Sequence, residues 1–245
     1  MTRHDGGGRP ETPTRILRDQ HRNILKVADV LGEILAHEPG SGVLDFDALA
    51  DCIAFIRLYA DALHHGEEED LLFPELEAVG LPRETGPIAV MLQEHRQGRA
   101  FASTMAGALE PARSGDGAAL SRLIGAAHGY IELIRGHILK EDHVLFEMAD
   151  QMIEPSTCRS LCAAYEGVCL RRFEGCTVTD LAARLARRVE AYPAAGGGAG
   201  VRPPPTRCFP NALLPPRLSR YPVPGCPHAA PPEGPSIPAS GLRGH

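Results

Sequence analysis

The sequence predicts an all-α protein, built as an antiparallel up-down four-helix bundle over residues 12–152 with further helices and a tail behind it. Hydrophobic residues make up 43% of the 245 residues, aromatic residues only 5%, and tryptophan is absent. A core of Leu, Ile, Ala and Val suits helices better than strands. Four long segments repeat apolar residues at alternating steps of three and four, the period of an amphipathic helix. Their connections are short, and this favours antiparallel neighbours.

The first two helices carry apolar stripes that each contain a histidine. The first helix begins at Thr12 and Pro13, with Thr as N-cap and Pro in the first turn, and ends before Pro39 and Gly40. Its stripe is Leu17, His21, Ile24, Ala28, Leu31 and Leu35. The second helix is predicted over 45–77, and its stripe is Leu49, Ile53, Ile56, Ala60, His64 and Glu68.

The third and fourth helices repeat this design. A break at Gly80, Leu81 and Pro82 precedes the third helix, which is predicted over 87–109. Its stripe is Ile88, Met91, His95, Ala102, Met105 and Leu109. The fourth helix is predicted over 117–152, and its stripe is Leu123, Ala127, Tyr130, Ile134, His137, Glu141, Leu145 and Met148.

The segments outside the bundle differ in composition. Residues 1–11 are expected to form a flexible arm, and accessory helices are predicted near 156–173 and 177–191, packed on the flank or end of the bundle. Residues 193–245 contain 14 prolines in 53 residues and include a GGGAG run near their start. Such a segment can neither continue a helix nor bury a core, so we expect a disordered tail whose removal leaves metal content and stability unchanged.

Charge and hydropathy exclude several classes of function. The net charge is −6, and because 193–245 holds five Arg and one Glu, residues 1–192 carry about −10. An acidic folded part argues against nucleic-acid binding by charge. No apolar run approaches the roughly 18 residues of a membrane span, and the N-terminus lacks the apolar core of a secretory signal. We therefore expect a cytoplasmic protein with no membrane and no nucleic-acid partner.

Seven cysteines are present and none forms a CxxC pair. An odd number fits poorly with a complete set of disulfides within the chain. Cys158, Cys162, Cys169 and Cys176 lie at spacings of four, seven and seven, which is one face of a helix if that helix is continuous. Buried, reduced thiols are the plainer interpretation, with a metal or redox role as the alternative.

Four histidines carry the chemistry of the bundle. His21, His64, His95 and His137 each replace an aliphatic residue on the inward stripe of a different helix. Four imidazoles in one core need partners for eight nitrogens, and an unpartnered buried polar group costs about 1–3 kcal/mol. A metal ion would satisfy one nitrogen of each ring.

Two of these histidines have a carboxylate one turn later, Glu68 after His64 and Glu141 after His137. Residues four apart share a helix face, about 6 Å along the axis, so imidazole and carboxylate can reach one ion or two neighbouring ions. The segments 64–76, HHGEEEDLLFPEL, and 137–149, HILKEDHVLFEMA, align without a gap as H-x3-E-[ED]-x2-L-F. His65 and Glu69 have the same spacing, but this pseudo-repeat favours His64 and Glu68.

With these motifs, the sequence resembles the haemerythrin-like, or HHE cation-binding, family. The resemblance covers about residues 12–152 through four motifs in order: DQHRNIL, HHGEEEDLLFP, MLQEHRQGR and YIELIRGHILKEDHVLF. It implies a non-haem di-iron site with terminal histidines, bridged by two carboxylates and a solvent oxygen. The implied metal ligands are His21, His64, Glu68, His95, His137 and Glu141.

One position departs from the oxygen-carrying members of that family. They place a second histidine one turn along the third helix, as H-x3-H, whereas this chain has Arg99 four residues after His95. The implied site therefore has four histidines rather than five, and reversible oxygen transport of the respiratory kind is not expected. Ferritin-like carboxylate sites are disfavoured, because no Glu is followed by His three residues later.

The function expected from these motifs is a di-iron binding protein that handles or senses oxygen, nitric oxide, peroxide or iron. A peroxide-consuming di-iron enzyme is the first alternative, and a metal-stapled interaction protein whose tail recruits a partner is the second. Nitrogen and oxygen ligands suit iron, manganese or zinc, so iron rests on the resemblance.

Several other polar residues lie near this site. Glu67, Glu69 and Asp70 are interpreted as a solvated helix face, with support of the ligands by one of them as the alternative. Glu94 is interpreted as a surface residue, and Tyr130 as either a core residue or a hydrogen-bond donor to a bridging oxygen. No role is assigned to His4, His37, His128, His228 and His245.

Overall fold

The structure is a computed structural model that describes residues 12–36, 44–169, 172–173 and 176–177. Four long helices form its main part. The first is α1 (Pro13–Ala36) and the third is α5 (Gly86–Arg113). The second is continuous through four labelled parts: α3 (Phe46–Phe55), η1 (Ile56–His65), η2 (Glu68–Leu72) and α4 (Phe73–Ala78). The fourth runs through α6 (Gly117–Lys140), η3 (Glu141–Leu145) and α7 (Phe146–Met152).

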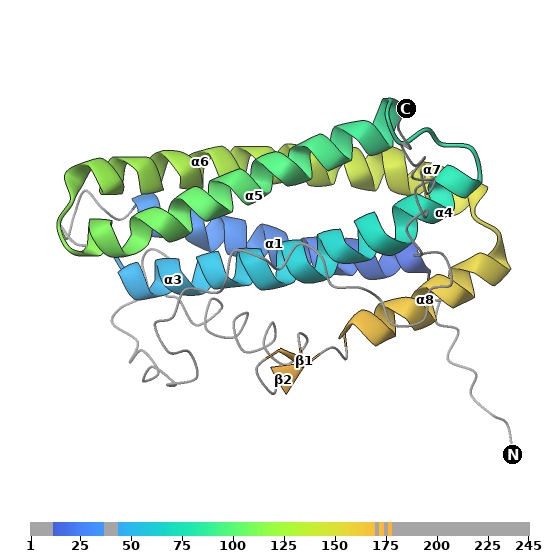
Figure 1. Cartoon of the computed structure of the whole chain (residues 1–245), viewed down its shortest axis with the longest axis horizontal. Coiled ribbons are helices and arrows are strands. Elements are labelled where there is room, and N and C mark those ends of the chain that lie inside the picture. Colours follow the sequence, from blue (N-terminus) through green and yellow to red (C-terminus); the bar gives the residue numbers. More distant parts are fainter. Residues whose placement is uncertain (1–11, 37–43, 170–171, 174–175, 178–245) are drawn as a thin grey trace, which may run out of the picture. The chain divides into compact units, whose positions relative to one another are not determined.

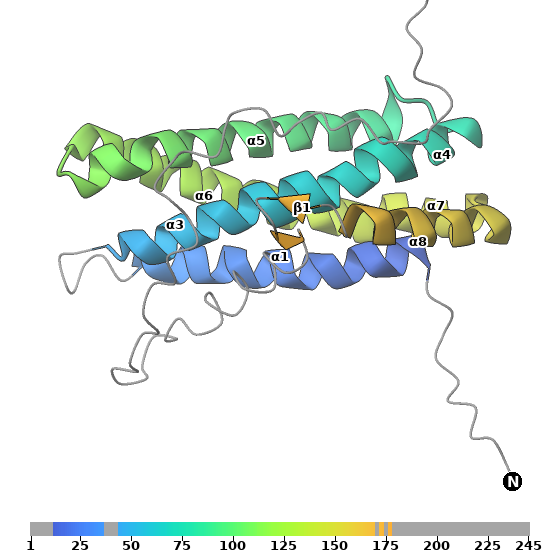
Figure 2. The same ribbon diagram turned by 60° about the horizontal axis from the view of Figure 1, so that its bottom comes forward.

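These helices form an antiparallel bundle in which each helix has two neighbours (Figures 1 and 2). α1 packs against α3 and α6, and α5 packs against the same two helices from the other side. Successive helices run in opposite directions along the bundle. The predicted all-α fold is confirmed, and the predicted bounds of the second and fourth helices are within one residue of those observed.

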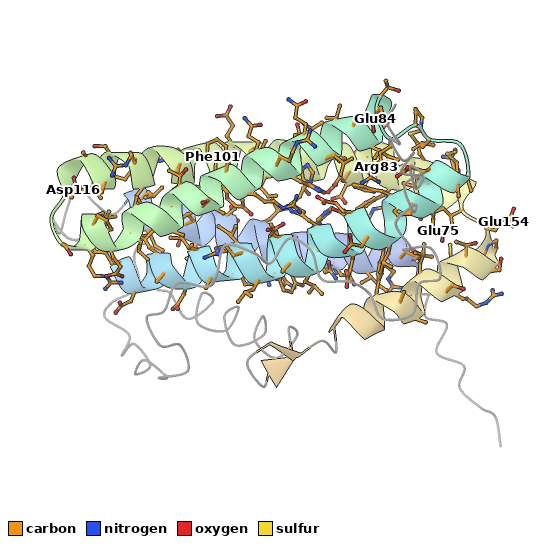
Figure 3. All side chains as sticks on the ribbon, viewed as in Figure 1. Glu75, Arg83, Glu84, Phe101, Asp116 and Glu154 are labelled. Atoms are coloured by element: carbon orange, nitrogen blue, oxygen red, sulfur yellow. The ribbon has the colours of Figure 1, made fainter. Side chains whose placement is uncertain are left out.

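Polar side chains cap the N-termini of α1, α3 and α6. The side chain of Asp45 accepts hydrogen bonds from the first backbone amides of α3, and Asp116 does the same for α6. Thr12 Oγ1 accepts a hydrogen bond from the backbone amide of Arg15 at the start of α1. Gly115, with φ of 96°, turns the chain between α5 and α6. Figure 3 shows Glu84 and Asp116 near opposite ends of α5.

Three parts of the second and fourth helices are π-helical, η1, η2 and η3. Each has backbone hydrogen bonds to the residue five positions earlier, a wider turn than that of an α-helix. The two copies of the pseudo-repeat share this feature. The amide of Phe73 donates to the carbonyl of Glu68, and the amide of Phe146 donates to that of Glu141. A sequence repeat is thus also a repeat of local backbone geometry.

The chain after the bundle differs from the prediction. α8 (Pro155–Cys169) ends before residue 173, and Arg172–Phe173 (β1) pairs antiparallel with Cys176–Thr177 (β2). The prediction of a helix over 156–173 is therefore wrong at its C-terminal end, and Cys176 cannot share a helix face with Cys158. Gly167 and Gly175 in this stretch weaken a helix. The predicted helix over 177–191, the arm and the tail lie outside the described residues, apart from Thr177 in β2.

α8 lies along one end of the bundle, where it contacts α1 and η2. Its Leu161 and Tyr165 are buried in a core cluster with Phe73 and Phe146. Cys158 and Cys162 are half-buried and form no disulfide. This cluster forms an apolar wall close to η2 and η3 in the second and fourth helices.

Among the described residues, no helix combines the length and the apolar character that crossing a membrane would require.

Candidate metal centre

The structure brings all six predicted site residues together in the bundle interior. His21 lies on α1, His64 on η1, Glu68 on η2, His95 on α5, His137 on α6 and Glu141 on η3. None of the six side chains is more than 2% exposed. Residues separated by more than a hundred positions thus share one buried cluster, because each lies on the inward stripe of its own helix.

The histidines approach one another as two pairs with similar geometry. His21 Nε2 lies 3.0 Å from His64 Nε2, and His95 Nε2 lies 3.2 Å from His137 Nε2. The ring planes are inclined at 68° in the first pair and 65° in the second. In both pairs the Nε2 atoms, rather than the Nδ1 atoms, point to the centre.

The two carboxylates each reach both histidine pairs. Glu141 Oε2 lies 3.1 Å from His21 Nε2, and Glu141 Oε1 lies 3.1 Å from His137 Nε2. Glu68 behaves in the same way, with Oε1 3.6 Å from His64 Nε2 and Oε2 3.4 Å from His95 Nε2. One oxygen of each carboxylate therefore faces each histidine pair, which is the arrangement a bridging ligand needs.

The polar atoms of this cluster call for cations. Glu68 and Glu141 are completely buried, and among the described residues the groups that approach their oxygens as ion-pair partners are histidine ring nitrogens. Burying an unpaired carboxylate is costly enough that such groups are normally paired or metal-bound. Two groups of four residues could each hold a metal ion, because within each group one ligand atom per residue lies within 4.8 Å of the others. The groups are His21, His64, Glu68 and Glu141, and His65, Glu68, His95 and His137. The donor set fits a metal ion in each pocket.

Outer partners orient all four histidines. Nδ1 of His21 donates to Asp142 (2.8 Å) and Nδ1 of His95 donates to Glu69 (2.6 Å). Nδ1 of His64 donates to Gln20 Oε1 (2.7 Å) and Nδ1 of His137 donates to Glu94 (3.0 Å). A hydrogen on Nδ1 leaves the Nε2 lone pair free for a metal ion, and partners of this kind raise the basicity of the ligand.

These contacts correct the interpretation of three carboxylates, Glu67, Glu69 and Glu94, as surface residues. Glu69 is half-buried between His95 and Arg99, whose guanidinium lies 2.9 Å from its Oε1. Glu67 is completely buried and accepts a hydrogen bond from Gln20 (2.7 Å). Helix periodicity alone placed both on a solvated face, but neighbouring helices cover them. Glu94 is half-buried and pairs with Lys140, whereas Asp70 is exposed, as expected.

The buried histidines and glutamates of the metal-free cluster have pKa values shifted in different directions. Burial lowers the pKa of His21, but Asp142, Glu141 and Glu68 outweigh it and raise that pKa to about 9. Burial and the charge of Glu141 raise the pKa of Glu68. Burial also raises the pKa of Glu141, but His137 and the other histidines outweigh this and hold it well below its usual range. The cluster therefore retains protons that a metal ion would displace.

His65 is a buried member of the cluster that the sequence interpretation set aside. Its side chain is only 4% exposed, and its ring stacks on that of His95 at 3.8 Å between centroids. The sequence treated His64 and His65 as alternatives, because adjacent residues of an α-helix point about 100° apart. In η1 both face the interior, since the wider π-helical turn brings successive side chains closer in direction.

Two aromatic rings frame the cluster at equivalent places. Phe146 stacks on His21 at 5.4 Å between centroids, and Phe73 stacks on His95 at 6.0 Å. Both phenylalanines belong to the L-F ending of the pseudo-repeat. Tyr130 is a core residue with 2% exposure, and its hydroxyl has no hydrogen-bond partner in the described structure. His128 is exposed, consistent with the absence of a role, and the other four histidines without one lie outside the described residues.

Comparison with known proteins agrees with this geometry. Uncharacterized proteins of Mycobacterium bovis and of two strains of Mycobacterium tuberculosis are each 24% identical to the chain over 178 residues, which covers 69% of this chain and 69% of each relative. No solved structure matches the chain significantly. The family model of the haemerythrin HHE cation-binding domain matches residues 12–149, the whole of the bundle up to α7. The chain belongs to the haemerythrin HHE cation-binding family, and its buried cluster of histidines and glutamates could hold metal ions.

Proposed function

We propose that this chain is a non-haem di-iron protein of the cytoplasm that handles or senses a small ligand such as oxygen, nitric oxide or peroxide. The observation that carries the proposal is the sharing of Glu68 and Glu141 between two histidine pockets. A single ion needs four to six donors, whereas this cluster offers more and divides each carboxylate between two sides. His21, His64, His95, His137 and the two glutamates would hold the ions, and iron would supply redox chemistry or ligand binding.

Burial limits the size of the ligand. Every side chain of the proposed centre is at most 2% exposed, so a molecule of a few atoms is the class that fits. The apolar rings of Phe73 and Phe146 beside the histidines favour small, weakly hydrated species over large polar substrates. This supports gases and peroxide rather than an organic metabolite.

The protein's own residues would hold the protons of the centre. Asp142 and Glu69 accept from the Nδ1 atoms of His21 and His95, and each keeps its ring turned with Nε2 inward. Burial raises the pKa of Glu69, but His95 and Arg99 outweigh it and lower that pKa to about 2, so this acceptor is ionised at any working pH.

Metal analysis combined with an optical spectrum tests the proposal. Protein loaded anaerobically with excess ferrous iron and then exposed to air should hold two iron ions per chain and gain oxo-bridge absorption in the near ultraviolet. One ion or none under these conditions would refute the di-iron proposal. Assays of peroxide consumption then separate the enzymatic alternative, which requires turnover, from a binding or sensing role.

A further inference from the structure

Sulfur-bearing side chains gather where the bundle passes into α8, outside the part of the chain that matches the family model. Cys158 and Cys162 lie four residues apart on α8, are both half-buried and form no disulfide. Met148 and Met152 belong to α7, and both pack against the same core cluster as Cys158. In Figure 1, α8 follows directly after α7 at one end of the bundle. Two thiols and two thioethers are thus available at this junction.

The first turn of α8 determines where the thiol of Cys158 points. The backbone amide of Cys158 donates to the carbonyl of Glu154 (3.0 Å), which is the regular bond of an α-helix. Its Sγ lies 3.9 Å from the carbonyl oxygen of Ile153, the residue that directly follows Met152. Figure 3 shows Glu154 at this turn. The thiol therefore points back toward the end of α7, where Met152 lies.

The spacing of the two thiols suits a shared ion better than a disulfide. Residues four apart on an α-helix have Cβ atoms about 5–6 Å apart, whereas a disulfide needs about 3.5–4.5 Å. Two sulfurs that bind one ion can lie up to about 4.6 Å apart, because a metal–thiolate bond is about 2.3 Å long. Cys158 and Cys162 can therefore reach the same ion while α8 keeps its helical backbone.

The donor atoms select a soft ion that needs few ligands. Thiolate and thioether sulfur favour Cu(I), whereas Zn(II) takes four donors in a tetrahedral site. Within the described part of the chain, both groups of His, Cys, Asp and Glu that could hold an ion belong to the buried centre, and neither includes a cysteine. Two thiols and one methionine supply the two or three sulfur donors that Cu(I) takes.

The thiols are accessible and can release protons to an incoming ion. Both cysteines are half-buried rather than enclosed, so an ion from solvent can reach them. Burial and the charge of Asp150 raise the pKa of Cys158, and they outweigh the opposite effect of Arg159. A bound ion must displace that proton, so its affinity should rise with pH.

We propose that Cys158, Cys162 and Met152 form a binding site for one Cu(I) ion, distinct from the buried histidine and glutamate centre. The ion would connect the end of α7 to the first two turns of α8, the helix that packs against α1 and η2. None of the three residues is a ligand of the proposed di-iron centre, so the two sites can be tested separately.

Titration of the whole chain with Cu(I) under anaerobic conditions tests this proposal, with a chromogenic Cu(I) chelator as competitor. The other cysteines outside the bundle are first replaced by serine, so that only the proposed pair remains on α8: Cys169, Cys176, Cys208 and Cys226. This parent variant should bind one Cu(I) per chain, and X-ray absorption should show sulfur as the nearest neighbour of copper. Absence of binding, or nitrogen as the nearest neighbour, would overturn the proposal.

Substitutions in the same parent identify the donors. Cys158→Ser and Cys162→Ser should each weaken Cu(I) binding by more than the roughly 10–100-fold typical of an outer partner. Met152→Leu keeps the apolar bulk and should have a smaller effect than the loss of a thiol. Cys52→Ser, which changes a buried cysteine of α3, is the control and should bind Cu(I) as the parent does.

A positional variant separates the site from the mere number of thiols. Cys162→Ala combined with Ala163→Cys keeps two cysteines on α8 but moves one by about 100° around the helix, to an exposed position. We expect this variant to lose tight Cu(I) binding while circular dichroism shows an unchanged helix content. Binding as tight as that of the parent would overturn the proposal, because the shared face of α8 would then not matter.

Discussion

The centre has two halves that resemble each other at the ligands and differ around them. The first half is α1 with the second helix, and the second half is α5 with the fourth helix. His21 corresponds to His95, His64 to His137 and Glu68 to Glu141. The outer partners correspond too, because Gln20 and Glu94 each precede the histidine of their helix, and Glu69 and Asp142 each follow the bridging glutamate.

The difference lies in what surrounds these equivalent residues. The pseudo-repeat aligns His65 with Ile138, so only the first half offers an additional imidazole. Glu67 is buried in the first half, where α8 packs against η2, while its counterpart Lys140 is partly exposed and pairs with Glu94. Duplicated geometry therefore provides two similar histidine pairs, and the residues around those pairs differ.

The bridging carboxylates should give the largest effect, and it should be equal in both halves. Glu68→Gln and Glu141→Gln each replace a carboxylate shared by the two proposed pockets with a neutral amide. We therefore expect metal analysis to show the loss of at least one ion per chain. The loss should exceed the roughly 10–100-fold affinity change typical of an outer partner. Asp70→Asn, an exposed neighbour on the same turn, is the control. Retention of both ions in only one of the two variants would break the equivalence of the halves.

The outer carboxylates should give an intermediate effect. Glu69→Gln and Asp142→Asn weaken the hydrogen bonds that orient His95 and His21, so each should lower metal affinity by about 10–100-fold. Competition with a chelator measures this. Glu69→Gln is thus not the neutral change that a solvated helix face would imply. A tenfold difference between the two variants would show that the neighbouring arginines contribute unequally, because Arg99 lies 2.9 Å from Glu69 whereas Arg18 lies 3.8 Å from Asp142.

Exchanging the residues before the histidines should have a smaller and asymmetric effect. Glu94→Gln reproduces the first half, where Gln20 accepts from its histidine, and the exposed pair with Lys140 contributes at most about 1 kcal/mol. Gln20→Glu instead removes a donor from buried Glu67 and adds a like charge, which should cost about 2–3 kcal/mol of unfolding free energy. Thermal unfolding at neutral pH measures both. Equal destabilisation would contradict the difference in burial between the halves.

Proton release on metal binding should give the smallest effect, a change in apparent binding enthalpy between buffers. His21 has a pKa of about 9 in the metal-free protein, and the pKa of His95 is also raised because Glu141, Glu68 and Glu69 outweigh its burial. At pH 7 both are therefore protonated, and an ion must displace those protons. The release from His21 should decline as the pH rises through about 9. Calorimetry in buffers of different ionisation enthalpy measures it, and equal enthalpies at pH 7 would argue against protonated ligands.

The sequence determined the helices and the inward positions of the six proposed ligands. Their inward positions follow from a 3.6-residue period, which is local, and the pseudo-repeat identified His64 with Glu68 as the partner of His137 with Glu141. Thr12 marked the start of the first helix for the same reason, because a cap bonds to amides two or three residues away. Each of these features depends on residues near one another in the chain.

Only the tertiary structure decided the surroundings of those ligands. Glu69 became a partner of His95, and Glu67 a partner of Gln20, because other helices approach the face on which they lie. His65 turned inward because η1 is π-helical, a hydrogen-bond register that apolar periodicity does not encode. A local repeat specifies which side of a helix is buried. Which residue it meets there depends on the packing of helices distant in sequence.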